Sequence, residues 1–202
     1  MKVLHIAIMR FNRDTPEPVV LHQGADVSAF GFFEKSTVRQ MLIFFSKTVV
    51  SRVKAGQRIT VDQEQMKEYE VHAFLRPDGL GATATCDKEY PARAAFNMLA
   101  ELMEGFAAAH PAWASELRSE ACPFPALDAA LVDAQDPAKF DKIIKIQNDL
   151  DDTTAVLHQT IDNLLERGEK LDNLVERSDD LSKQSKLFYK QARKTNSCCV
   201  VC

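Results

Sequence analysis

The first half of the chain switches between two hydrophobic periods. Several short stretches alternate apolar and polar residues, a pattern typical of half-buried strands. Between them, residues 36–55 repeat apolar positions every three or four residues, which predicts a helix that begins at Ser36 and ends before Gly56. A second helix is predicted to open at Pro91. The predicted strands cover residues 2–9, 18–23, 57–63, 67–77 and 80–87.

This order of elements predicts an α+β fold. Two strands, a helix, three strands and a helix favour an antiparallel sheet of about five strands covered by helices. A short helix is expected around residues 125–134. Phe44 lies off the main apolar stripe of the first helix and therefore indicates a second apolar contact. Either another helix of the same domain covers it, or it lines a groove for an amphipathic segment or a lipid chain.

The C-terminal part has a different pattern. Residues 138–195 carry one long helical pattern with a heptad seam, which has Arg167 at its middle and charged flanks. A single such helix does not stay folded alone, so it needs partner helices. The buried guanidinium would need polar partners, and small seam residues favour more than two helices. The alternative is a homo-oligomeric coiled coil in which Arg167 belongs to a flank. The apolar seam residues are Ile143, Ile146, Leu150, Leu157, Leu164, Leu171, Leu174, Leu181 and Phe188.

Composition and motifs exclude several classes of protein. The chain has 202 residues and a net charge of -4, so it lacks the basic footprint of a non-specific nucleic-acid binder. Its longest apolar run, residues 41–45, falls far short of the roughly 20 residues that cross a bilayer. The N-terminus is typical of a strand rather than a signal peptide, so the thiols are expected to be reduced. We expect no catalytic residue, metal or cofactor, and the missing phosphate-binding loop excludes a prenylated small GTPase.

The cysteines divide into two groups. Cys86 and Cys122 have no metal-ligand spacing and are expected to be small buried residues. The chain ends in Cys198-Cys199-Val200-Val201-Cys202, and its last four residues fit a C-a-a-X box that would be prenylated on Cys199. One isoprenoid gives reversible attachment only, so Cys198 is the expected site of a palmitoyl or second prenyl chain. A terminal cysteine departs from the usual farnesyl pattern and leaves the choice of isoprenoid open.

The stretch "LLERGEKLDNL" around Arg167 is similar to the R-SNARE motif, and the whole chain resembles the Ykt-type prenylated longin R-SNAREs. The likeness extends through "DVSAFGFFEKSTVRQ" and "EYPARAAF". It implies a profilin-like longin domain over residues 1–135, with helices on both faces of its antiparallel sheet. A SNARE motif would follow over residues 136–197 and a lipidation segment over 198–202. Arg167 would be the zero-layer arginine, facing glutamines from Qa-, Qb- and Qc-SNARE helices in a four-helix bundle.

The resemblance also implies a function. The protein would mediate vesicle docking and membrane fusion, held on membranes by its lipids. It would cycle between the cytosol and the cytoplasmic face of Golgi, endosomal or vacuolar membranes. The longin domain would fold back over the SNARE segment and shield the lipid, with Phe44 in the groove. The alternative is a lipid-anchored coiled-coil tether or adaptor, which would self-associate and be insensitive to changes at Arg167.

Overall fold

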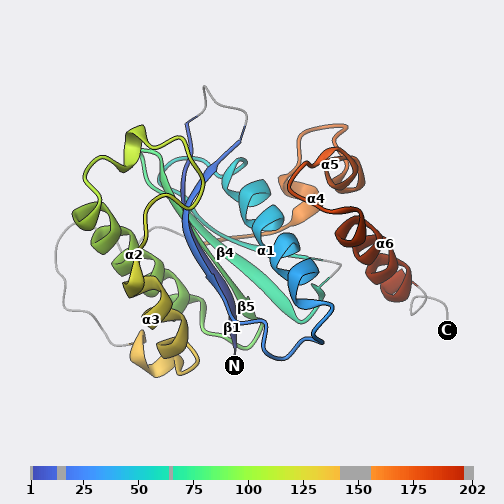
Figure 1. The fold of residues 1–202 in the computed structure, drawn as a ribbon, viewed down its shortest axis with the longest axis horizontal. Helices are drawn as coiled ribbons and strands as arrows, with labels where there is room; N and C mark the ends of the chain where they lie inside the picture. Colours follow the sequence, from blue (N-terminus) through green and yellow to red (C-terminus); the bar gives the residue numbers. More distant parts are fainter. Residues whose placement is uncertain (1, 13–16, 64–65, 142–155, 198–202) are drawn as a thin grey trace.

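The computed structural model describes residues 2–12, 17–63, 66–141 and 156–197 (Figure 1). Its centre is a six-stranded sheet with the order β2-β1-β5-β4-β3-β6. The strands are β1 (Val3–Arg10), β2 (Val19–Ala25), β3 (Arg58–Asp62), β4 (Tyr69–Leu75), β5 (Leu80–Asp87) and β6 (Leu157–Thr160). The helices are α1 (Lys35–Val50), α2 (Ala92–Ala109), α3 (Pro125–Asp133), α4 (Ile161–Leu164), α5 (Leu171–Arg177) and α6 (Lys183–Ser197), with 3₁₀ turns η2 (Trp113–Ser115) and η3 (Pro137–Lys139).

The order of elements predicted for the first half is confirmed. The strands β1 to β5 pair antiparallel throughout. The hairpin between β4 and β5 turns at Gly79, whose φ of +90 favours glycine. The carbonyl of Gly79 accepts a hydrogen bond from the Phe11 amide at 2.9 Å, which ties this hairpin to the end of β1.

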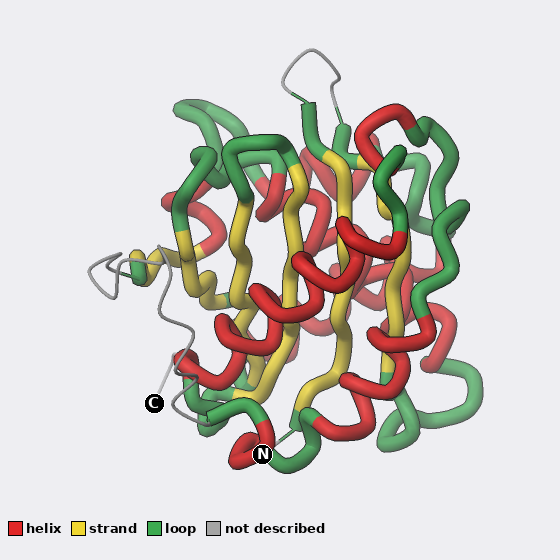
Figure 2. Tube along the Cα trace, turned by 90° about the vertical axis from the view of Figure 1, so that its left-hand side faces the viewer, coloured by secondary structure: helices red, strands yellow, loops and turns green. Residues whose placement is uncertain are grey.

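Helices cover both faces of the sheet, as predicted. The helix α1 crosses one face, and α2 and α3 cover the other (Figures 1 and 2). Each face has its own apolar core: one includes Phe45 and Val49 of α1, the other Leu99 of α2 and Leu127 of α3. Because α1 packs into one of these cores, its position on the sheet is fixed, and its outer surface faces away from the sheet.

A buried histidine joins α1 to the sheet. His5 of β1 donates from Nε2 to Gln23 Oε1 at 2.8 Å, and its Nδ1 accepts from the Ser46 hydroxyl at 3.3 Å. Burial lowers the pKa of His5 to about 4, although the hydrogen bond to Gln23 acts in the opposite direction. The histidine therefore stays neutral near pH 7.

The C-terminal part differs from the single long helix expected from the heptad pattern. The described residues 156–197 form a short strand and three helices instead. The strand β6 pairs parallel with β3, from Ile59 opposite Leu157 to Asp62 opposite Thr160, and so adds a strand that the sequence did not predict. The physical reason is that a lone amphipathic helix cannot bury its apolar seam. Here the segment buries part of that seam against α1 and uses the free edge of β3 for hydrogen bonds.

Candidate functional site: the α1 face that holds the C-terminal segment

Phe44 lies where α1 meets the C-terminal segment. It is 6% exposed and belongs to an apolar cluster that includes Leu171, Val175 and Leu181. It also lines a cavity of about 330 Å³ together with Leu174. A residue that lies off the sheet-facing stripe of α1 is thus buried by a segment far away in the sequence.

The predicted seam residues are only partly brought together. Leu171 and Leu181 are buried, Leu164, Leu174 and Phe188 are half-buried, and Leu157 is exposed. Ile143, Ile146 and Leu150 lie outside the described residues.

Sequence reasoning missed three residues of this surface. Ile161, Val175 and Tyr189 are buried in the same cluster as Phe44, yet none is on the seam. Val175 lies four residues after Leu171, so a second stripe beside the seam was the available signal. The segment therefore presents a different combination of side chains to α1 from the one a coiled coil would use.

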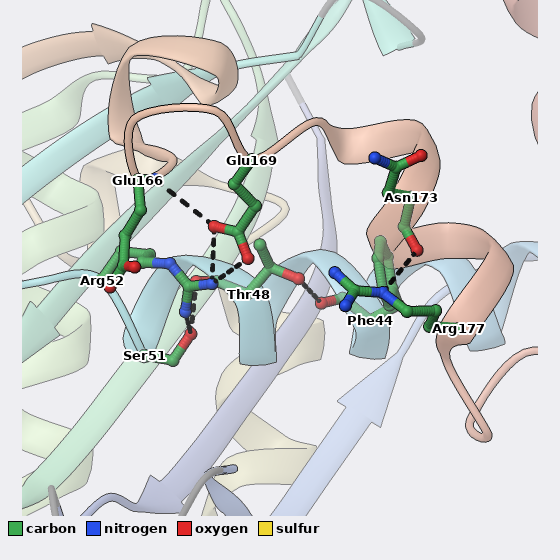
Figure 3. A network of polar contacts seen from close by, with 8 residues as sticks. All are labelled: Phe44, Thr48, Ser51, Arg52, Glu166, Glu169, Asn173 and Arg177. Carbon is green, nitrogen blue, oxygen red and sulfur yellow. Dashed lines mark hydrogen bonds and ion pairs between the residues drawn. The ribbon is translucent and has the colours of Figure 1, made fainter.

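An ion pair joins the C-terminal end of α1 to the loop before α5 (Figure 3). Arg52 Nη2 donates to both carboxylate oxygens of Glu169, at 2.9 and 2.8 Å. The same carboxylate accepts from the Glu166 amide at 3.3 Å. Burial acts to raise the pKa of Glu169, but the hydrogen bond from Arg52 leads the groups that outweigh it, and the pKa is lowered. The carboxylate is therefore ionised at neutral pH, and both of its oxygens accept charge-assisted hydrogen bonds from the guanidinium.

Two further polar ties hold the segment to α1. The ammonium of Lys47 pairs with Asp180 and with Glu17. Burial acts to lower the pKa of Lys47, but these carboxylates outweigh it and the pKa is raised. Gln40 Oε1 accepts from the Ser182 amide at 2.9 Å and from the Ser185 hydroxyl at 2.8 Å. We call the packing of residues 156–197 on α1 and β3 the closed arrangement.

Arg167 is exposed in a turn between α4 and α5, and not in an apolar seam. The turn depends on Gly168, whose φ is +89. The position of Arg167 at the centre of the heptad pattern therefore has no role in the closed arrangement.

An apolar cavity of about 420 Å³ opens beside the end of α6. Its walls come from the loop before α1, from α1, from the start of β4 and the residues before it, and from α6; they include Phe30, Met41, Tyr69, Phe188 and Ala192. Such a volume is within the usual range for a bound small apolar ligand. Cys198 and Cys199, the predicted lipid sites, lie outside the described residues.

The described residues contain no arrangement suited to metal chemistry and no membrane-crossing helix. No group of three or more His, Cys, Asp and Glu side chains among them is placed to hold a metal ion. None of their helices combines the length and apolar character that crossing a bilayer requires. Cys86 and Cys122 are buried, as predicted, and burial raises the pKa of both thiols.

Comparisons with known proteins agree with this architecture. The regulated-SNARE-like longin domain matches residues 27–131, and synaptobrevin matches residues 142–200. The chain belongs to the longin-bearing R-SNAREs of the synaptobrevin family, which confirms the resemblance and the prediction that it is not an enzyme.

Within that family it is of the Ykt type. It is 44% identical to a VAMP-like protein, YKT61, of Arabidopsis thaliana, over the full length of both chains. It is 43% identical to the synaptobrevin homolog ykt6 of Schizosaccharomyces pombe and 41% identical to YKT6 of Saccharomyces cerevisiae, again over the full length of each chain.

Proposed function

We propose that this R-SNARE of vesicle transport drives docking and fusion by joining one Qa-, one Qb- and one Qc-SNARE helix in a parallel four-helix bundle. The heptad seam supplies the apolar layers, and Arg167 faces the glutamines of the partners. Assembly from Ile143 towards Phe188 would bring the lipid-bearing end and the opposing membrane together. Burial of apolar surface along the seam provides the free energy.

We further propose that the closed arrangement is the inhibited state of the protein. The observation that carries this proposal is the burial of the seam residues Leu171 and Leu181 against the cluster that contains Phe44. A seam residue that is buried on α1 is not available to a bundle. The segment must therefore leave α1 before it can pair with Q-SNARE helices.

The lipid anchor fits the same scheme. We propose that Cys199 carries an isoprenoid and Cys198 a palmitoyl or second prenyl chain, because one chain alone holds a protein on a membrane only reversibly. In the closed state one lipid chain would lie in the apolar cavity lined by Phe30 and Ala192. Ala192 lies only a few residues before the cysteines in the sequence. The protein would then cycle between the cytosol and the cytoplasmic face of Golgi, endosomal or vacuolar membranes.

The change Phe44→Glu tests the inhibited state. A buried carboxylate would disrupt the cluster with Leu171 and Leu181, so the lipidated protein should move from the cytosolic to the membrane fraction. Phe124→Glu is the matched control, because Phe124 is 7% exposed but packs in the core on the opposite face of the sheet. If Phe44→Glu leaves the fractionation unchanged, or if the control shifts it equally, the proposal fails.

A lipid-anchored coiled-coil tether without fusogenic activity is the competing function. It predicts self-association without Q-SNAREs and no effect of Arg167→Ala. Our proposal predicts that Arg167→Ala lowers the melting temperature of the four-component bundle. It also predicts an unchanged closed protein, because Arg167 is exposed there. Circular dichroism of the full chain, alone and mixed with Qa, Qb and Qc helices, separates the two functions.

A further inference from the structure

Two adjacent phenylalanines stand out on the surface of the closed protein. Phe32 and Phe33 are each 83% exposed, more than any other large hydrophobic residue that the structure describes. Their rings contact edge to face, with centroids 5.4 Å apart. They belong to the loop between β2 and α1, and the proposed function assigns them no role. Two large aromatic side chains in water are costly, so their exposure needs an explanation.

The loop holds the pair in a defined place. The Gly31 amide donates to the Glu34 carboxylate at 3.1 Å, and the Glu34 amide donates to the Gly31 carbonyl at 2.9 Å. These two bonds close a tight turn around the pair and fix the start of α1. The rings are therefore presented outward by a constrained turn.

The same loop lies against the last turns of α6. Phe30 packs in one cluster with Phe188, and it lines the apolar cavity together with Tyr189 and Ala192. The loop before α1 and the C-terminal end of α6 lie at the same end of the molecule (Figure 1). Cys198 and Cys199 follow Ser197, the last residue of α6, directly. The part of α6 that precedes these cysteines therefore lies near the loop that carries Phe32 and Phe33.

The charges around this end are mixed but include cations suited to an anionic surface. Lys194 near the end of α6 and Arg39 of α1 are exposed. Lys190 and Arg193 are neutralised by Glu176 and Asp172 in the closed arrangement. Cations close to an anionic leaflet favour membrane binding.

We propose that Phe32 and Phe33 form a membrane contact, which inserts into the interface of an anionic leaflet beside the lipid anchor. The proposal rests on the proposed lipidation for its second attachment point. A protruding pair of rings suits a soft lipid interface, where aromatic side chains are readily accommodated. Phe32 and Phe33 would make the first contact of the closed protein with the membrane, and the lipid would add the second attachment once the closed arrangement releases it.

Vesicle binding of the full-length protein tests the contact. The double change Phe32→Ser/Phe33→Ser should lower partitioning onto vesicles of phosphatidylcholine and phosphatidylserine about tenfold, which corresponds to about 1.4 kcal/mol. The matched control is Leu117→Ser/Val132→Ser, since these residues are 73% and 74% exposed but lie outside the loop. Unchanged binding of the phenylalanine variant would overturn the proposal and leave a protein partner as the explanation. An equal loss in the control would overturn it too, because it would indicate non-specific adhesion.

The lipid anchor is tested separately. The pair of variants is repeated in a chain with Cys198→Ser/Cys199→Ser, which carries no lipid. The phenylalanine change should weaken the remaining binding by the same factor. If removing the cysteines changes nothing while the phenylalanine effect persists, the anchor is wrong and the contact stands.

A spectroscopic readout avoids any loss of folding. Trp113 is the single tryptophan and is buried. In a Trp113→Phe background, Phe33→Trp places the fluorophore at the proposed contact. Its emission should shift to the blue when phosphatidylserine vesicles are added, and an unshifted spectrum at saturating lipid contradicts insertion.

Discussion

Replacement of Gly168 by alanine should open the closed arrangement without touching any contact that holds it. Gly168 has a φ of +89 in the turn where the Glu169 amide donates to the Glu166 carbonyl at 2.9 Å. A methyl group added at this glycine would meet no atom within 4 Å. The effect of the change is therefore a property of the backbone alone.

The magnitude is the sum of two effects with the same sign. In the closed turn, an L-residue with a side chain is disfavoured in the left-handed region by about 1–2 kcal/mol. In the open state the same position lies inside the proposed SNARE helix, where alanine is favoured over glycine by about 0.5–1 kcal/mol. Together they shift the equilibrium towards the open state by about 2 kcal/mol, or roughly 30-fold.

Hydrogen exchange of the full chain measures this shift directly. Amides of α5 and α6 should exchange roughly 30-fold faster in Gly168→Ala, and assembly with Q-SNARE helices should accelerate. Gly56→Ala is the matched control: Gly56 has a φ of +81, also has open space around it, and lies in the turn between α1 and β3. Its strain is the same in both states. Unchanged exchange in Gly168→Ala, or equal acceleration in Gly56→Ala, would refute the reasoning.

Two further predictions concern the Arg52–Glu169 ion pair and the titration of His5. Arg52→Glu should favour the open state by about 2 kcal/mol, because the Glu169 carboxylate loses its charged donor. The charge-swapped double variant Arg52→Glu/Glu169→Arg should restore the protection of α5 amides in the same hydrogen-exchange assay. His5 should make folding stability depend on pH, since its folded pKa of about 4 lies below the unfolded value of 6.5. Between these values the unfolded chain binds a proton that the folded chain does not, so stability falls by up to about 3 kcal/mol as the pH drops. Urea unfolding at pH 7 and pH 4.5 should show a smaller pH difference in His5→Asn, and an equal difference would contradict this assignment.

The sequence predicted the elements whose hydrophobic period matches the surface they bury. Successive residues of β1 pack into alternate cores, such as Ile6 on one face and Ala7 on the other, because the sheet lies between two layers of helices. The helix α1 follows its stripe because Phe45 and Val49 face that sheet. Phe44 departed from the stripe and correctly indicated a second apolar contact. The hydrophobic pattern alone did not identify its partner, because the cluster depends on which distant segment folds over it; only the family resemblance implied the SNARE segment.

The C-terminal segment shows why a periodic pattern does not determine a structure by itself. Its heptads describe a helix that has partners, whereas in the closed protein the partner is α1. Residues 157–160 fit the helical period, yet they form β6 because the edge of β3 offers unpaired hydrogen-bonding groups. Val175 and Tyr189 were missed because they lie beside the seam and become buried only in this arrangement.

The closed state and the proposed bundle use some of the same residues and differ in others. Substitutions can therefore change the relative stability of the two states. Leu171 and Leu181 are seam residues that are buried here, so the closed state and the bundle exclude each other. The ties to α1 through Glu169, Asp180 and the Ser182 amide come from positions between the seam residues. Substitutions at the first two would therefore change the stability of the closed state and leave the apolar layers of the bundle intact. A protein whose fusion machinery must be both stored and released needs this separation, because its stored state can then be tuned without weakening the bundle that follows.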